Sequence, residues 1–110
     1  MKKYYLYLYK IIRLYITMTE VLQQDDGKHG KFHIAENGKD LAYMTYTWAG
    51  TDKFIIDHTD VNPILKGQGI GLRLVEAAVL FAREKGIKII PLCPFAKATL
   101  DKHSEWQDIL

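Results

Sequence analysis

The segment Gly67-Gln68-Gly69-Ile70-Gly71 places three glycines at alternate positions immediately before an amphipathic stretch. On a 3.6-residue period, apolar side chains from Leu72 to Ala82 line one face, and charged side chains point away from it. Gly86 then follows a basic last turn and is a typical C-terminal cap. The pattern predicts a glycine-rich loop followed by a helix that lies on a sheet.

Strand-like segments lie on both sides of this loop and helix. Residues 54–61 (FIIDHTDV), rich in β-branched side chains, precede the loop, and residues 87–92 (IKIIPL) follow the helix. A strand, a helix and a strand in this order predict a right-handed crossover between two parallel strands. Because Pro91 and Pro94 cannot donate to a ladder, we expect the second strand to lose its pairing at its C-terminal end.

The preceding residues predict an antiparallel meander. Asn37-Gly38 between two alternating runs, residues 31–36 and 41–49, is a strong hairpin signal, and residues 54–61 supply the third strand. The predicted fold class is therefore α/β (α+β), a mixed sheet in which the meander continues into the parallel crossover.

The two ends of the chain differ from this middle part. Residues 23–30 (QQDDGKHG) are polar and predict a turn, and residues 97–110 are periodic enough to predict one C-terminal helix. Residues 1–17 are crowded with Tyr, Ile and Leu, lack any acid, and are shorter than the roughly 20 apolar residues of a membrane helix. Three interpretations of them stay open: an extension upstream of a true start at Met18, an amphipathic helix on a membrane surface, or an extra element packed on the domain. Residues 18–110 are predicted to form one domain.

Composition excludes several classes of function. Hydrophobic residues make up 48% of the 110 residues and charged residues 25%, and the net charge of +2 is spread thinly rather than gathered into a nucleic-acid footprint. Four histidines and one cysteine form no metal-ligand spacing. The single cysteine, Cys93, allows no internal disulfide and fits a reducing cytoplasm. We therefore expect no nucleic-acid partner, no metal, no integral membrane span and a cytoplasmic location.

A glycine-rich turn between a strand and a helix suits a phosphate ligand. Backbone N–H groups converge there, the helix dipole is positive, and glycine lets the ligand approach the backbone. Leu72-Arg73 after the last glycine excludes the P-loop pattern, and the absence of glycine at position 72 excludes the dinucleotide fingerprint. The alternative is that the glycines only shape a turn.

Taken together, four short motifs resemble one family. Lys66-Gly67-Gln68-Gly69-Ile70-Gly71 follows the form (Gln/Arg/Lys)-x-x-Gly-x-Gly and resembles the GNAT superfamily of N-acetyltransferases. His58-Thr59-x-Val61 before the loop, Pro91-x-Cys93 after the next strand and His103-x-Glu105-Trp106 near the end narrow the resemblance to the small, minimal GNAT-like family.

The resemblance covers about residues 24–110 and implies a minimal GNAT-like fold that uses acetyl-CoA as cosubstrate. It implies transfer of an acetyl group to the amine of a small molecule or a protein, with the acceptor unidentified because the helical region that holds it in larger members is missing. Lys66 departs from the usual Gln or Arg, since lysine keeps the charge but lacks the forked donors of arginine. A short sheet with few covering helices also favours self-association as a homodimer.

Cofactor-binding residues follow from the same resemblance. It implies that backbone N–H groups from Gln68 to Leu72 hold the pyrophosphate and that the pantetheine arm lies where the two parallel strands separate. Lys97 and Lys102 are further candidates for the phosphates. The expected cofactor-binding set is Val61, Lys66, Gly67, Gln68, Gly69, Ile70, Gly71, Leu72 and Cys93.

Two residues, His58 and Cys93, are candidates for catalysis. An amine with a pKa of about 10.4 is almost fully protonated at pH 7, so acetyl transfer needs a base or desolvation of the amine. Histidine titrates near neutral pH, which makes His58 a candidate base, whereas alternation is expected to place Asp57 and Asp60 on the opposite face from it. Cys93 is either an inert buried thiol or the site of a transient acetyl-cysteine. A coenzyme-A-binding module without catalysis and a structural or interaction domain are the alternatives to an enzyme.

Overall fold

The computed structural model describes residues 20–110 of the chain. The predicted boundary at residues 17 and 18, and the three interpretations of the segment before it, lie outside the described residues. The elements are β1 (Leu22–Asp25), β2 (His29–Glu36), β3 (Lys39–Trp48), β4 (Lys53–Val61), the 3₁₀ turn η1 (Pro63–Leu65), α2 (Ile70–Lys85), β5 (Lys88–Pro91), α3 (Pro94–Asp101) and the 3₁₀ segment η2 (Ser104–Ile109).

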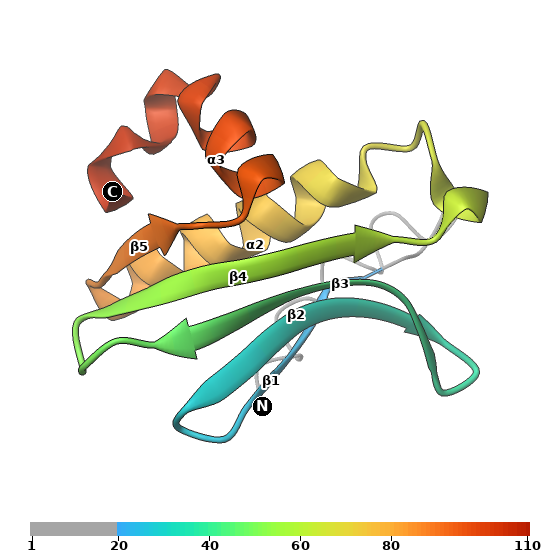
Figure 1. The fold of residues 1–110 in the computed structure, drawn as a ribbon, viewed down its shortest axis with the longest axis horizontal. Helices are drawn as coiled ribbons and strands as arrows, with labels where there is room; N and C mark the ends of the chain where they lie inside the picture. The colour runs from blue at the N-terminus through green and yellow to red at the C-terminus, as the bar shows by residue number, and fades with distance from the viewer. Residues whose placement is uncertain (1–19) are drawn as a thin grey trace.

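One mixed sheet runs through the described part of the chain, with the strands in the order β1-β2-β3-β4-β5 (Figure 1). The first four strands are antiparallel, and β4 and β5 are parallel. α2 connects these two strands and packs against β2, β3, β4 and β5. The predicted meander and parallel crossover are therefore confirmed.

Two turn signals of the sequence have the conformations that they predicted. Asn37 and Gly38 between β2 and β3 both have positive φ, 52° and 79°, as a tight two-residue hairpin requires. Gly86 ends α2 with φ 70°, and its N–H donates to the carbonyls of Ala82 and Arg83.

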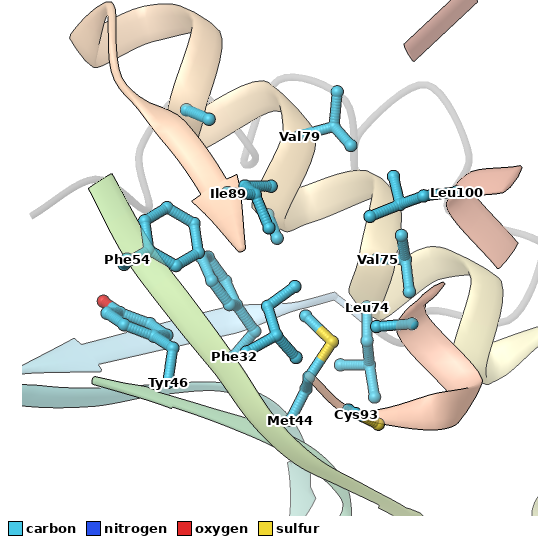
Figure 2. Close-up of a cluster of buried hydrophobic side chains, with 14 of the residues drawn as sticks. Phe32, Met44, Tyr46, Phe54, Leu74, Val75, Val79, Ile89, Cys93 and Leu100 are labelled. Atoms are coloured by element: carbon cyan, nitrogen blue, oxygen red, sulfur yellow. The ribbon is translucent and has the colours of Figure 1, made fainter. Parts of the chain in front are cut away.

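The core lies between the sheet and α2 (Figure 2). On the sheet side, Tyr46 and Phe54 are almost fully buried, with ring centroids 4.8 Å apart. On the helix side, Leu74, Val75 and Val79 are completely buried. The predicted apolar face of the helix thus packs on the sheet, except at Leu72, which is 40% exposed.

The polar turn predicted over residues 23–30 is confirmed only for residues 26–28. Its first residues belong to β1, an edge strand paired with β2, and its last two residues begin β2. Polar side chains suit β1 since they satisfy the hydroxyl of Tyr46. Asp25 accepts from the Tyr46 hydroxyl at 2.5 Å and from Trp48 Nε1 at 2.9 Å, and Gln23 Nε2 donates to the same hydroxyl at 2.8 Å. Burial, followed by the hydrogen bond to Asp25, raises the pKa of the Tyr46 phenol above its ordinary value.

The single C-terminal helix predicted over residues 97–110 is also wrong. Pro94 at the first turn starts α3 earlier, and the chain breaks at Lys102 and His103 before η2. The break returns Trp106 to the core, where it is 9% exposed. Gln107 Nε2 compensates the interrupted ladder by donating to the carbonyls of Leu100 at 2.7 Å and His103 at 3.1 Å.

An ion-pair network on the face of the sheet away from α2 predicts acid sensitivity. Asp40 accepts from His33 Nδ1 at 2.7 Å and pairs with Lys31. Partial burial alone would raise the pKa of the Asp40 carboxyl, but these two partners outweigh it and lower the pKa. The stabilisation is therefore present above the unfolded pKa of about 3.9 and is lost as the pH falls through the lower folded value.

We expect Asp40→Asn to flatten the loss of unfolding free energy between pH 5 and about pH 3, measured by urea denaturation at both pH values. Asp101→Asn is the control, since Asp101 is in an exposed pair with Lys97. Equal pH dependence of the two variants would contradict the role of Asp40.

Candidate functional site

β4 and β5 separate at the place where the prolines predicted it. Their parallel pairing runs from Lys53 and Lys88 to Ile56 and Pro91. The amides of Leu92 and Cys93 then both donate to the carbonyl of Ile56, at 3.2 and 3.0 Å, and the chain turns into α3. In the described part of the chain, residues 58–61 of β4 pair with β3 alone. A gap therefore opens in the sheet beside the second half of β4.

A β-bulge lies where this gap begins. Ile56 and His58 pair with consecutive residues of β3, so Asp57 is an extra residue in β4. Asp57 Oδ2 accepts from Thr47 Oγ1 at 2.7 Å, and this contact places the carboxylate on the face away from α2. The expectation that Asp57 and Asp60 face away from His58 is wrong, because the bulge turns Asp57 to the same face and Asp60 lies two residues further along the strand.

His58 and Thr59 lie on opposite faces of β4. Thr59 pairs with the fully buried Met44 and so faces α2. His58 is exposed on the other face, where its ring lies 6.1 Å from that of Tyr43, centroid to centroid.

Cys93 lies at the start of α3, beside the gap. Its thiol is buried, 4% exposed, and Sγ lies 3.3 Å from Thr59 Oγ1. Figure 2 shows the sulfur at the margin of the core, on the side of Met44 and Leu74. The structure thus brings Cys93 to Thr59 but not to His58, which is on the opposite face of β4.

A cavity of about 510 Å³ lies between the end of β4, the glycine loop and α3, within the usual size range of small-molecule sites. Seven of the nine expected cofactor residues line it: Val61, Lys66, Gly67, Gly69, Ile70, Gly71 and Leu72. Cys93 does not line it, although its Sγ lies 3.3 Å from Oγ1 of the lining residue Thr59. Gln68 does not line it either, and its amide donates to the carbonyl of Leu65 at 3.4 Å.

Five further lining residues were not predicted as part of the site: Thr59, Leu65, Phe95, Thr99 and His103. Thr59 and His103 had the clearest sequence signals, since each lies inside a motif that carries the family resemblance. Phe95 had a weaker signal, its position directly after the Cys93-Pro94 pair. Nothing in the local pattern pointed to Leu65 or Thr99.

The glycines of the loop serve two different purposes. Gly67 and Gly69 have φ of 78° and 68°, and a Cβ at either position would meet no atom within 4 Å, so the backbone is open to a ligand. Gly69 is the N-cap of α2, and the first hydrogen bond of the helix runs from the Arg73 amide to its carbonyl at 3.1 Å. The amides from Gly69 to Leu72 have no acceptor within the helix, as is general for a first turn.

Gly71 is needed for packing against α3. A Cβ at Gly71 would lie 2.6 Å from Cζ of the Phe95 ring, a distance at which one group must move. Phe95 is 43% exposed and lines the cavity, so the ring covers the start of α2.

We expect the effect of Gly71→Ala to depend on Phe95. In a Phe95→Ala background the new methyl has space, and the substitution should raise the unfolding free energy by about 0.5–1 kcal/mol through helix propensity. With Phe95 present the clash should cancel this gain. Urea unfolding of the four proteins measures the coupling. The same effect in both backgrounds would contradict the contact.

Basic side chains also line the cavity. Lys66 comes from the loop, and Lys102 and His103 come from the connection between α3 and η2. Lys97, the other candidate for a phosphate, pairs with Asp101 at 3.0 Å and lies outside the lining. The cavity therefore combines open backbone amides with positive charge, an arrangement that suits phosphate groups.

Two kinds of feature are absent from the described residues. Residues 20–110 contain no group of three or more His, Cys, Asp or Glu side chains placed to hold a metal ion. No helix in the same range reaches the length and hydropathy needed to cross a membrane.

Comparison with known proteins gives consistent results. The NMR structure of a GCN5-like protein from Staphylococcus aureus is 38% identical, with a TM-score of 0.66 over 86% of this chain and 89% of that one. Protein NATD1 of Xenopus tropicalis is 31% identical over 71 residues, which are 64% of this chain and 65% of that relative's length. The aminoglycoside N-acetyltransferase AAC(6')-Iy in complex with CoA shares the fold at 12% identity, with a TM-score of 0.52 over 79% of this chain and 89% of that one.

The family model of GCN5-related N-acetyl-transferases matches residues 31–109, which include all five parts of the proposed site: the bulged strand, the gap, the glycine loop, Cys93 and the His103 motif. The chain belongs to the GCN5-related N-acetyltransferase family.

Proposed function

We propose that the protein is an acetyl-CoA-dependent N-acetyltransferase acting on an amine. The observation that supports this most is the cavity, which joins the open backbone of the glycine loop to the gap between β4 and β5. A phosphate-bearing cofactor with a long, thin arm matches this shape. Acetyl transfer is the chemistry of the family, and a CoA complex of a protein with the same fold supports the choice of cofactor.

The residues expected to bind the cofactor form two groups with different roles. Amides of Gly69, Ile70, Gly71 and Leu72, with Lys66 beside them, bind the pyrophosphate. The arm runs along Val61 and Thr59 toward Cys93, where β4 has free backbone groups on the side of the gap. Gln68 and Gly67 shape the loop.

Direct transfer fits the position of Cys93 better than an acetyl-cysteine does. In direct transfer the amine nitrogen attacks the thioester carbonyl carbon, the C–S bond breaks, CoA leaves as a thiolate, and a base takes the amine proton. Cys93 is 4% exposed, and its thiol is hydrogen-bonded to the Thr59 hydroxyl, so the thiol is poorly placed to attack a thioester. Cys93 then acts by positioning Thr59 beside the arm.

His58, exposed beside the gap, is the proposed base. Asp57 and Asp60 lie on the same face as His58 and help attract a cationic amine.

The test is turnover of labelled acetyl-CoA with a panel of amines. We expect His58→Ala to lower kcat by about 10²–10⁴-fold. Cys93→Ala should keep most of its turnover, and the intact mass of the wild-type protein incubated with acetyl-CoA alone should not increase. An acetyl adduct that is absent in Cys93→Ala would refute direct transfer, and full activity of His58→Ala would refute the proposed base.

One observation favours a coenzyme-A-binding module as the second candidate. Within residues 20–110, the His58 ring contacts Tyr43 and forms no hydrogen bond with a carboxylate that would orient it as a base. A module would bind acetyl-CoA with unchanged affinity in His58→Ala and would acetylate no amine in the panel.

We also propose a cytoplasmic location and self-association as a homodimer. Cys93 is a free thiol, which suits a reducing cytoplasm. Self-association as a homodimer is testable by sedimentation at several concentrations, where a mass that stays at 12.7 kDa would exclude it.

A further inference from the structure

His103 is held in a fixed orientation at the wall of the cavity. Its ring stacks on Trp106, with centroids 4.2 Å apart and an angle of 17° between the planes. Nδ1 lies 2.8 Å from Glu105 Oε2, which leaves Nε2 as the nitrogen available to a ligand. The hydrogen bond from His103 lowers the pKa of the Glu105 carboxyl, so Glu105 is an ionised partner near neutral pH.

The backbone of this connection is equally fixed. The His103 amide donates to the Leu100 carbonyl at 3.1 Å, and the His103 carbonyl accepts from the Trp106 amide at 3.0 Å. Arg83 on α2 holds η2 in place, because Arg83 Nη2 donates to Oδ1 of Asp108 at 2.6 Å. The break between α3 and η2 therefore presents Lys102 and His103 to the cavity from a rigid support.

The basic side chains of the cavity come from two separate parts of the chain. In its lining, drawn from the described residues, Lys66, Lys102 and His103 are basic and no carboxylate is present. The amides at the start of α2 and Lys66 are the groups proposed above for the pyrophosphate. Lys102 and His103 come from a different element and provide a second basic group.

We infer that Lys102 and His103 bind the 3′-phosphate of coenzyme A, separately from the pyrophosphate held at the glycine loop. This inference rests on the proposed function, because it assumes that coenzyme A occupies the cavity. The 3′-phosphate is a dianionic group on the ribose, apart from the pyrophosphate. It matches the Lys102 ammonium and the His103 ring on a second wall, where Nε2 donates to an anion when the ring is protonated. Lys102 and His103 are then specificity residues that favour coenzyme A over its 3′-dephospho form.

The experiment compares the affinities of CoA and 3′-dephospho-CoA by calorimetry at low ionic strength. We expect the wild type to bind CoA about tenfold more tightly or better, since two charge-assisted contacts are lost with the phosphate. The Lys102→Met, His103→Gln double variant should bind both ligands with the affinity that the wild type has for dephospho-CoA. Lys102→Met alone should show an intermediate preference if the double variant is unstable. Lys97→Met, in the adjoining helix α3 but outside the lining, should keep the full preference.

Three results would overturn the inference. Equal affinity of the wild type for the two ligands would show that the 3′-phosphate is not bound. An equal loss of affinity for both ligands in the double variant would place Lys102 and His103 on the pyrophosphate instead. If the wild type binds neither ligand, the proposed function fails, and the 3′-phosphate site fails with it.

Discussion

Phe54→Ala should lower the unfolding free energy by about 3–5 kcal/mol, the usual cost of removing a fully buried phenylalanine. Phe54 has no exposed surface and lies among aromatic rings, with its centroid 4.8 Å from Tyr46, 5.9 Å from Trp48 and 5.8 Å from Phe81. A domain of this size is typically stable by about 5–15 kcal/mol, so the variant should approach unfolding at room temperature.

Phe95→Ala is the matched control for this loss. The ring is 43% exposed and lies at the cavity, so its removal should cost less than about 1 kcal/mol. Urea denaturation of both variants against the wild type measures the difference. Similar costs for Phe54 and Phe95 would mean that the core is not centred on the cluster shown in Figure 2.

Gly69→Val should reduce the affinity for acetyl-CoA by about 10- to 100-fold. The N-cap of α2 has φ 68°, a conformation that strains a β-branched residue by about 1–2 kcal/mol. The substitution would shift the amides that we propose for the pyrophosphate, and a hydrogen bond to a charged group contributes about 1.5–3 kcal/mol. The added side chain would also occupy the open space beside the loop.

Gly27→Val separates loss of binding from backbone strain. Gly27 has φ 94°, is equally open to solvent, and lies in the turn between β1 and β2, outside the cavity lining. We expect it to lose stability like Gly69→Val but to bind acetyl-CoA like the wild type in calorimetry. Unchanged affinity in Gly69→Val would remove the glycine loop from the site.

The fold could be predicted where one local signal determined each element. Asn37-Gly38 fixed a hairpin, and Gly86 ended a helix whose apolar period was clear. β1 was missed because its polar side chains serve the hydroxyl of Tyr46, a partner 21 residues away from Asp25 that no local pattern shows. The C-terminal break was missed because it depends on Trp106 returning to the core and on the side chain of Gln107.

The residues of the loop were predicted better than those of the strand. Alternation from the buried Phe54 and Ile56 would place His58 on the face of α2, beside the cavity. The bulge at Asp57 reverses this order, so Thr59 and Val61 line the cavity and His58 faces the other side. Sequence alone gave no sign of the bulge, because it is visible only in the pairing of β4 with β3.

The most direct test of the proposed site is the unfolding free energy of the protein with and without acetyl-CoA. Binding to the native state alone adds RT ln(1 + [L]/Kd), which is about 2.7 kcal/mol when the free ligand is 100 times Kd. We predict this rise for the wild type and a clearly smaller one, at the same ligand concentration, for Gly69→Val. No rise at millimolar acetyl-CoA would contradict a cofactor site between the glycine loop and the gap in the sheet.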